Sequence, residues 1–404
     1  MSKKKKKIII ITFIVILVVL LVVVFVVGFS PFKSGFKYRP LESVVKKQYK
    51  VVKKDYDNLI LPKEIREVNP EKLYTFDSIR ADKPITDESK KLFVELVNVF
   101  SNRNYTTADL SYLDIEPSYA ELFDNGYLNL FYEGNTFDLT TKEFANKRIN
   151  NIVKIEKVIH VDRGEKTNVS YDVDGKSYSV KQAIAYAEEY LEKINISKYL
   201  LKGDELRISS VSVVEVYDTD EDAKSLSYEE RQKLSTTYIY LVNFDHYYYG
   251  VPVNNSGTNG YDDNGFHFPR WFTVGIGAPD SVGWLYNVGS WGLENQQEIT
   301  DDVIDLSSCL STVSEWLSEY KKYEVKEISM VYNSIQYGIN NGDSFEIRPM
   351  WRIVLDEYDG SDKSFNMASP KLTVNVDMQN GNMYMFDDAS GEMVDVRLNN
   401  KTTD

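Results

Sequence analysis

Four acidic residues within one short segment have the spacing of a calcium-binding loop. They are Asp218, Asp220, Asp222 and Glu229, at positions 1, 3, 5 and 12 of that segment. In a loop of the EF-hand type, alternate carboxylates and a bidentate glutamate surround the cation in this order. However, Ala223 stands where such a loop needs glycine for its sharp turn, and residues 211–217 alternate like a strand instead of a helix. We therefore favour a solvated acidic loop, and a calcium site is the alternative.

The residue types that most often carry catalysis form no recognisable constellation in this sequence. The histidines are His160, His246 and His267, and no two of them have metal-ligand spacing. Neither a His-Glu-x-x-His nor a Gly-x-Ser-x-Gly motif is present. We therefore expect a protein that is not an enzyme and needs no cofactor. A cell-surface hydrolase that uses paired carboxylates is the distant alternative.

The first thirty residues have the pattern of a membrane anchor. Lysines fill residues 3–7, and residues 8–29 are an uncharged run of mostly Ile, Val and Leu. A run of that length crosses a hydrocarbon core of about 30 Å. It is longer than the apolar region of a signal peptide, and residues 26–31 offer no good cleavage site. We expect a single-pass protein with residues 1–7 in the cytoplasm and the C-terminal bulk outside the cell.

The composition limits the partners of the part that follows. The formal net charge is −14, and removing the five leading lysines leaves the remainder more acidic still. Such a surface repels nucleic acid, so nucleic-acid binding is excluded. Because Cys309 is the single cysteine, no internal disulfide can form. Stability must therefore come from apolar burial, which 29 Tyr and 19 Phe can supply.

Two segments have matching helical patterns. In Ser179–Ile194 and in Asp305–Tyr320, apolar residues recur at steps 0, 3, 4, 7, 10, 11 and 14. Ser179 with Gln182 forms a capping-box pattern at the start of the first segment, and Asp305 can cap the second. The spacing therefore predicts two amphipathic helices of about four turns each.

Each predicted helix is followed by strands that end in a similar hairpin. Residues 272–276 and 284–287 pair around one turn, and residues 372–376 and 384–387 pair around another. We interpret residues 178–300 and 301–395 as two copies of one helix-plus-antiparallel-sheet unit. The fold class is α+β, and residues 396–404 are expected to form a polar tail.

The region before the two units is predicted to hold two further parts. Residues 30–80 contain a heptad-like stripe, which indicates a juxtamembrane helix ending before Pro62. The stripe consists of Val45, Tyr49, Val52, Tyr56 and Leu59. This helix either pairs with a partner's membrane-proximal helix or lies on its own domain, and the sequence leaves both open. Residues 81–177 read as a separate α+β domain with a boundary near Ser177.

Aromatic residues and one long polar loop are the candidate contact surfaces. Residues 247–249 are three consecutive tyrosines, and Trp284 and Trp291 follow in the same unit. They either line a recognition groove or fill the core between helix and sheet, which is the commoner role. The loop Asn254–Gly265 has no counterpart in the second unit, and we prefer it for partner contacts.

The helix at residues 179–191 and the hairpin at 372–381 resemble those of PepSY-type modules. Three further stretches are Tyr249-Gly250-Val251-Pro252-Val253, Val331-Tyr332 and Arg348-Pro349-Met350-Trp351-Arg352. In their order they resemble the YycH/YycI group of single-pass regulators in Gram-positive bacteria. This resemblance implies a non-enzymatic protein that holds a sensor kinase through its transmembrane and membrane-proximal helix.

We therefore expect an extracytoplasmic binding or regulatory protein that is anchored in the cell membrane. The alternative is a PepSY-like inhibitor or chaperone of a secreted protease, with a sheet edge pairing to its target. The sequence does not identify the ligand or the oligomeric state.

Overall fold

The computed structural model describes most of the chain after residue 35. The described residues are 36–51, 55–63, 65–79, 87–102, 104–108, 126–131, 136–200, 202–219, 222–253, 271–288, 292–317, 321–336, 344–358, 372–386 and 393–395. The predicted anchor at 8–29, the loop Asn254–Gly265 and the tail 396–404 lie outside them. Among the described helices, none has both the length and the apolar character that a membrane crossing requires.

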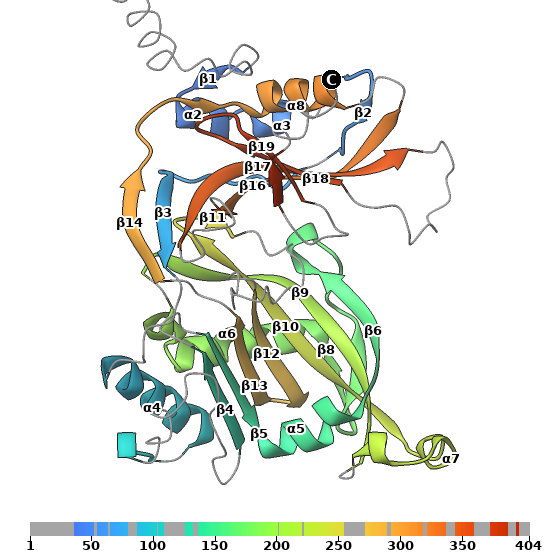
Figure 1. The fold of residues 1–404 in the computed structure, drawn as a ribbon. Coiled ribbons are helices and arrows are strands. Elements are labelled where there is room, and N and C mark those ends of the chain that lie inside the picture. Colours follow the sequence, from blue (N-terminus) through green and yellow to red (C-terminus); the bar gives the residue numbers. More distant parts are fainter. Residues whose placement is uncertain are drawn as a thin grey trace, which may run out of the picture.

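The chain forms two units, each built on one large sheet (Figure 1). The lower unit in that view has the strand order β4-β5-β13-β12-β10-β9-β6, with the short strand β11 (Val251–Pro252) paired to β10. Its long strands are β4 (Gly126–Phe131), β5 (Thr136–Thr141), β6 (Ile152–His160), β9 (Asp204–Tyr217), β10 (Thr236–Tyr248), β12 (Trp271–Ala278) and β13 (Ser281–Val288).

Helices cover the two faces of the lower sheet unequally. The helices α4 (Asp87–Ser101) and α6 (Val180–Lys193) share one buried core with one face, and the short helix α5 (Lys142–Lys147) packs on the other. Ser179 caps α6 with the predicted capping box, because its hydroxyl accepts from the Gln182 N–H and Gln182 bonds back to the Ser179 N–H. The predicted helix at residues 179–194 is therefore confirmed.

The upper unit has the strand order β14-β3-β17-β18-β19-β20, with β16 on the other side of β17. Its strands are β2 (Leu59–Ile60), β3 (Tyr74–Ile79), β14 (Gly292–Glu298), β16 (Lys322–Gln336), β17 (Ser344–Tyr358), β18 (Leu372–Asp377), β19 (Met383–Phe386) and β20 (Met393–Asp395). Helix α8 (Leu306–Trp316) covers one face. Asp305 caps this helix as predicted, accepting from the Ser308 N–H at 2.7 Å. The predicted end at Tyr320 is wrong, because Leu317 is already extended.

The two units contain the same series of elements in the same order. A helix is followed by four antiparallel strands that pair with their neighbours in chain order, α6-β9-β10-β12-β13 below and α8-β16-β17-β18-β19 above. Both predicted hairpins are present, with Val274 opposite Leu285 and Val374 opposite Met385. The fold is mixed α+β, made mostly of strands with few helices.

Residues 81–177 do not form the separate domain that we predicted. Strand β5 pairs with β13, and β6 pairs with β9, so residues from this segment flank both sides of the lower four-stranded series. Helix α4 buries Leu96 and Val97 in the core that α6 also fills. A local hairpin lies within this segment: Asp174 and Gly175 both have positive φ between β7 (Ser170–Val173) and β8 (Lys176–Ser179), as a type I′ turn requires.

The predicted juxtamembrane helix is also wrong over its described residues. The segment forms two short helices, α2 (Leu41–Val45) and α3 (Gln48–Val51), and Leu59 lies on strand β2, which pairs with β16. Gln48 is buried and exchanges hydrogen bonds with the backbone of Val68, which fixes this segment on the upper unit. Of the stripe residues, Tyr56 and Leu59 pack into the protein's own upper core, so these two do not face a partner helix.

Candidate functional site

A groove on the lower unit lies between α4, the second half of α6 and the turn between β12 and β13. It has a volume of about 910 Å³ and opens to solvent. Its apolar lining comes from Val94, Val99, Phe100, Tyr186, Tyr190 and Val282, and its polar lining from Lys91, Glu95, Asn98, Asn102, Asn104, Lys193, Asp280 and Ser281. We call it the tyrosine groove. A groove of this size, with an aromatic side and a largely polar rim, has room for a ligand or for part of a partner protein.

The two tyrosines stand on one face of α6 because they are four residues apart. The ring centroids of Tyr186 and Tyr190 lie 6.4 Å apart, which gives the groove a continuous aromatic wall. Asp280 on the opposite side is held at φ +57° in the two-residue turn after β12, where Asp tolerates the left-handed conformation. The Tyr178 hydroxyl donates to Asp280 Oδ1 at 3.1 Å and fixes the carboxylate.

The phenols of the groove remain protonated at neutral pH. Burial and the Asp280 carboxylate raise the pKa of Tyr178 to about 12. Burial, followed by the same carboxylate, also raises the pKa of Tyr186. Burial and the neighbouring Tyr186 raise the pKa of Tyr190. Neutral phenols donate hydrogen bonds and do not act as nucleophiles, so this wall is suited to recognition.

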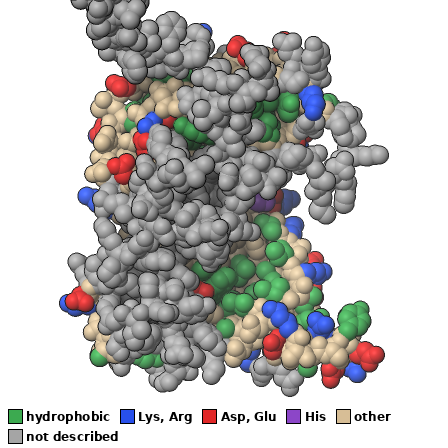
Figure 2. Space-filling model, in the orientation of Figure 1, with side chains coloured by type: hydrophobic (Ala, Val, Ile, Leu, Met, Phe, Trp, Pro, Cys, Tyr) green, Lys and Arg blue, Asp and Glu red, His purple; other side chains and the backbone are tan. Residues whose placement is uncertain are grey.

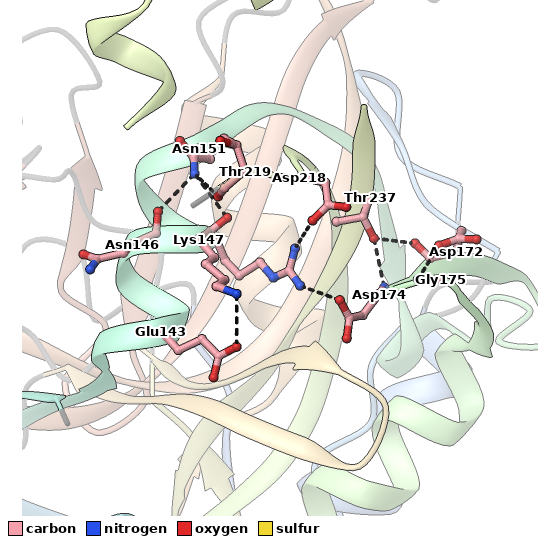
Figure 3. A network of polar contacts seen from close by, with 11 residues as sticks. Glu143, Asn146, Lys147, Asn151, Asp172, Asp174, Gly175, Asp218, Thr219 and Thr237 are labelled. Carbon is pink, nitrogen blue, oxygen red and sulfur yellow. Dashed lines mark hydrogen bonds and ion pairs between the residues drawn. The ribbon is translucent and has the colours of Figure 1, made fainter. Parts of the chain in front are cut away.

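Two of the predicted calcium ligands in the acidic loop, Asp218 and Asp222, already have other partners in the protein (Figure 3 for Asp218). Arg148, whose side chain is 8% exposed, lies between Asp174 and Asp218, with nitrogen–oxygen distances of 3.1 and 3.6 Å. Asp222 caps a single 3-10 turn by accepting from the Lys224 N–H, and Glu229 lies in α7 (Tyr228–Arg231). Asp220 lies outside the described residues. No group of three possible metal ligands occurs in the part of the chain that the structure describes.

A buried asparagine that the sequence did not indicate positions this loop. The Asn151 amide donates to the carbonyls of Asn146 and Thr219 at 3.0 and 3.2 Å (Figure 3). Its oxygen accepts from the Ala223 N–H at 2.8 Å. One side chain therefore ties the end of α5 to Thr219 and Ala223 in the first half of the acidic segment. Ala223 itself is buried. The short helix α7 begins with a capping box formed by Ser227 and Glu230.

The three consecutive tyrosines join the two units. Tyr248, at the end of β10, is fully buried in the upper core, with ring centroids 6.3 Å from Phe76 and 6.4 Å from Tyr332. Tyr249 and Gly250 have positive φ and turn the chain into β11, whose successor Val253 pairs with Tyr332. Of the two roles left open for these tyrosines, the structure supports the core.

Charged groups surround the same joint. Arg66, from the segment before β3, lies 3.3 Å from Asp245 and 3.4 Å from Asp162, and it also bonds to the Tyr247 hydroxyl. Burial raises the pKa of Asp245, and the Arg66 guanidinium offsets part of that rise. The guanidinium of Arg207 lies 4.3 Å from the centroid of the Tyr247 ring, on the lower unit. These contacts link the upper segment to the lower sheet.

A histidine–aspartate pair is completely buried beside the joint. His246 Nδ1 lies 2.9 and 3.0 Å from the two oxygens of Asp204, and neither side chain is exposed. Burial alone would lower the pKa of His246, but the Asp204 carboxylate outweighs it and raises that pKa. The neighbouring Asn287 side chain also raises this pKa. Burial also raises the pKa of Asp204, and both side chains are enclosed in the interior.

The remaining sequence candidates do not meet in one place. Trp284 lies on the face opposite α6, where it stacks on Tyr286 and donates to Asp138 at 2.7 Å. His160 ends β6 and is partly exposed. His267 and Trp291 lie outside the described residues. The tyrosine groove was missed because α4 and α6 are far apart in the chain, and only Tyr186 and Tyr190 at a four-residue spacing gave a local sign of it.

Comparisons with known proteins include a likeness to a solved structure. No family model matches the chain, and no curated protein matches its sequence. A crystal structure of an uncharacterized protein from Eubacterium rectale is similar at a TM-score of 0.47 and 12% identity. The match covers 86% of this chain and 99% of that one.

Proposed function

We propose that this chain is a single-pass, membrane-anchored regulatory protein that recognises a partner outside the cell through the tyrosine groove. The observation that carries the proposal is the groove itself, with its wall of Tyr186 and Tyr190 and its open lysine-bearing rim. Aromatic walls with protonated hydroxyls supply apolar contact and hydrogen bonds together, which is the usual composition of a recognition site.

The arrangement of the units fits a tether at residues 8–29. Strand β1 (Tyr38–Arg39) pairs with β15 (Val303–Ile304) at the end of the upper unit that is farthest from the lower one (Figure 1). A chain that leaves the membrane shortly before β1 would place the upper unit near the bilayer. The groove would then lie at the membrane-distal end, where a soluble ligand or the outer domain of a membrane protein can reach it.

The shared series of elements supports an origin by duplication of one PepSY-like unit. In this proposal the upper copy became a support for the lower copy. The stretch Arg348–Arg352, which carries part of the resemblance to single-pass regulators, fits this supporting role. Its Trp351 is fully buried and donates a hydrogen bond to the Ile304 carbonyl at 2.8 Å. The resemblance to single-pass regulators suggests a sensor kinase as the partner.

Photo-crosslinking in native membranes tests this function. Val99 lines the groove and is 44% exposed, so a photoreactive residue there would contact a bound partner. Tyr358 of the upper unit is 47% exposed and lies outside the groove, which makes it a matched control. We expect one membrane kinase to be captured at position 99 and not at 358. Equal capture at both positions, or none at 99, would contradict the proposal.

A second candidate function is inhibition of a secreted protease. Strand β6 favours it, because it forms an outer edge of the described lower sheet and could add a strand from a target. Capture of a protease from a photoreactive residue on β6, together with slower proteolysis by that enzyme, would support this candidate over the first.

A further inference from the structure

Strand β6 is an exposed edge with an unusual distribution of side chains. Among the described strands it pairs with β9 alone. Ile152, Ile155 and Val158 are 43%, 62% and 38% exposed, although the strand lies in a well-packed sheet. Figure 2 shows hydrophobic side chains gathered on this region of the lower unit. Large apolar residues at an open sheet edge mark an interaction surface.

Two irregularities in the pairing of β6 with β9 place these residues on the same face. The register shifts between Ile152 and Lys154 and again between Ile155 and Lys157. As a result, Ile152 and Ile155 stand opposite Val216 and Val214, and Val158 stands opposite Ser212. These partners alternate with Val213 and Val211, which face the α6 core. The β-bulges thus give a strand with apolar residues at every third position on the face away from α6.

The sequence of the strand is complementary to itself. Around Ile155 as a centre, Lys154 mirrors Glu156 and Ile152 mirrors Val158. If two such strands run antiparallel with Ile155 opposite Ile155, each Lys154 faces a Glu156 and each Ile152 faces a Val158. Within one chain Lys154 Nζ already lies 2.7 Å from Glu156, so both groups lie on the same side of the strand. Oppositely charged and apolar cross-strand pairs stabilise such a ladder.

We propose that β6 pairs with β6 of a second copy of this chain, forming a two-fold dimer centred on Ile155. The added pairing then holds three apolar pairs on the face away from α6 and two Lys–Glu pairs on the other side. Val153, which is 38% exposed, faces Lys157 at the two remaining positions. An isologous contact needs this self-complementarity, because each residue meets its mirror partner. The contact is one strand wide, so it belongs to the small, transient class of interfaces and depends on concentration. The dimer does not rest on the proposed function of the groove.

A charge exchange between two variants tests the pairing on the full-length protein. Lys154→Glu alone places glutamates opposite one another, and Glu156→Lys alone places lysines opposite one another. Sedimentation velocity should show each variant to be more weakly self-associated than the wild type, by at least tenfold. Mixing the two should restore association, because every lysine then faces a glutamate. If mixing restores association, the weaker association of each single variant cannot be the result of a folding defect. Failure of the mixture to associate, while the wild type does, would overturn the proposed register.

A cysteine at the proposed axis gives an independent test. Ile155→Cys should form a disulfide-linked dimer under mild oxidation, because the two side chains meet at the axis. Lys181→Cys, on the exposed side of α6, is the matched control and should remain monomeric. The native Cys309 is completely buried and does not compete. Equal crosslinking of both variants, or a wild type that stays monomeric at all concentrations, would overturn the dimer. If a different protein shields the cysteine of Ile155→Cys from oxidation, that protein pairs with β6 in place of a second copy of this chain.

Discussion

Asp204 and His246 form a completely buried charge pair, with Nδ1 2.9 and 3.0 Å from the two carboxylate oxygens. His246 lies on β10 between Phe244, which fills the lower core, and Tyr248, which fills the upper one. The pair therefore lies where the two units meet. This joint is the natural place to test the account of stability.

His246 should make the stability of the protein depend on pH above neutrality. Its pKa is raised in the folded state, so the stabilisation is complete below the unfolded value of about 6.5 and is lost as pH rises through the folded pKa. We expect the unfolding temperature to fall as pH rises above about 6.5. His246→Asn should be less stable at pH 6 and should lose this slope. His160→Asn, at the exposed end of β6, should keep it. An unchanged slope in His246→Asn would show that another group titrates.

Removal of the carboxylate should be costly because it leaves an imidazole with no charged partner in the interior. We expect Asp204→Asn to lower the free energy of unfolding by about 3 kcal/mol. Denaturation of the detergent-solubilised chain, followed by tryptophan fluorescence, measures it. Glu298→Gln is the matched control, since the Lys72–Glu298 pair lies on the surface at 2.8 Å and is exposed on both sides. We expect no measurable change there. Equal effects in the two variants would argue against a special role for the buried pair.

The acidic loop should not respond to calcium. Asp218 is already engaged by Arg148, and the Asp222 side chain caps a 3-10 turn. Calorimetric titration with calcium to millimolar concentration should give no saturable heat, and the unfolding temperature should not rise. A saturable signal that disappears in Asp222→Asn would restore the calcium site.

The backbone of the acidic loop should loosen when Asn151 is shortened. Asn151→Ala should increase hydrogen exchange at residues 222–226, because the Asn151 side chain anchors that backbone.

The tyrosine groove should lose affinity when a phenol is removed without changing its shape. Tyr190→Phe deletes one hydroxyl and keeps the ring, so partner capture from position 99 should weaken by roughly fivefold, the equivalent of one hydrogen bond of about 1 kcal/mol. Tyr171→Phe is the control, because Tyr171 packs against Tyr238 and Tyr240 outside the groove. Identical capture by the two variants would exclude a direct role for Tyr190.

Local patterns in the sequence predicted the elements whose spacing is set by their own backbone. The three-and-four periodicity identified α6, and the turn residues identified the hairpins. Long-range pairing was not visible: nothing near Leu139 indicates that it will lie opposite Leu285. The stripe from Val45 to Leu59 misled because a buried amide at Gln48 and strand pairing at Leu59 override helical periodicity.

The bulges of β6 illustrate a second limit. A strand is expected to alternate every second residue, whereas Ile152, Ile155 and Val158 reach the same face at every third. That arrangement depends on the partner strand, so the sequence alone reads as an irregular apolar segment. Likewise, the roles of Arg148 and Asn151 depend on the acidic loop folding against them, and their own sequence neighbours do not indicate that contact.

Cysteine labelling in intact cells tests most directly whether a membrane tether presents the groove to the outside. Cys309 is buried, so a membrane-impermeant maleimide reports only an introduced cysteine. We predict that Val99→Cys is labelled in intact cells, that Lys3→Cys is labelled only after permeabilisation, and that both stay in the membrane fraction after an alkaline wash. Labelling of Val99→Cys only after permeabilisation, or release of the protein by the wash, would contradict the account.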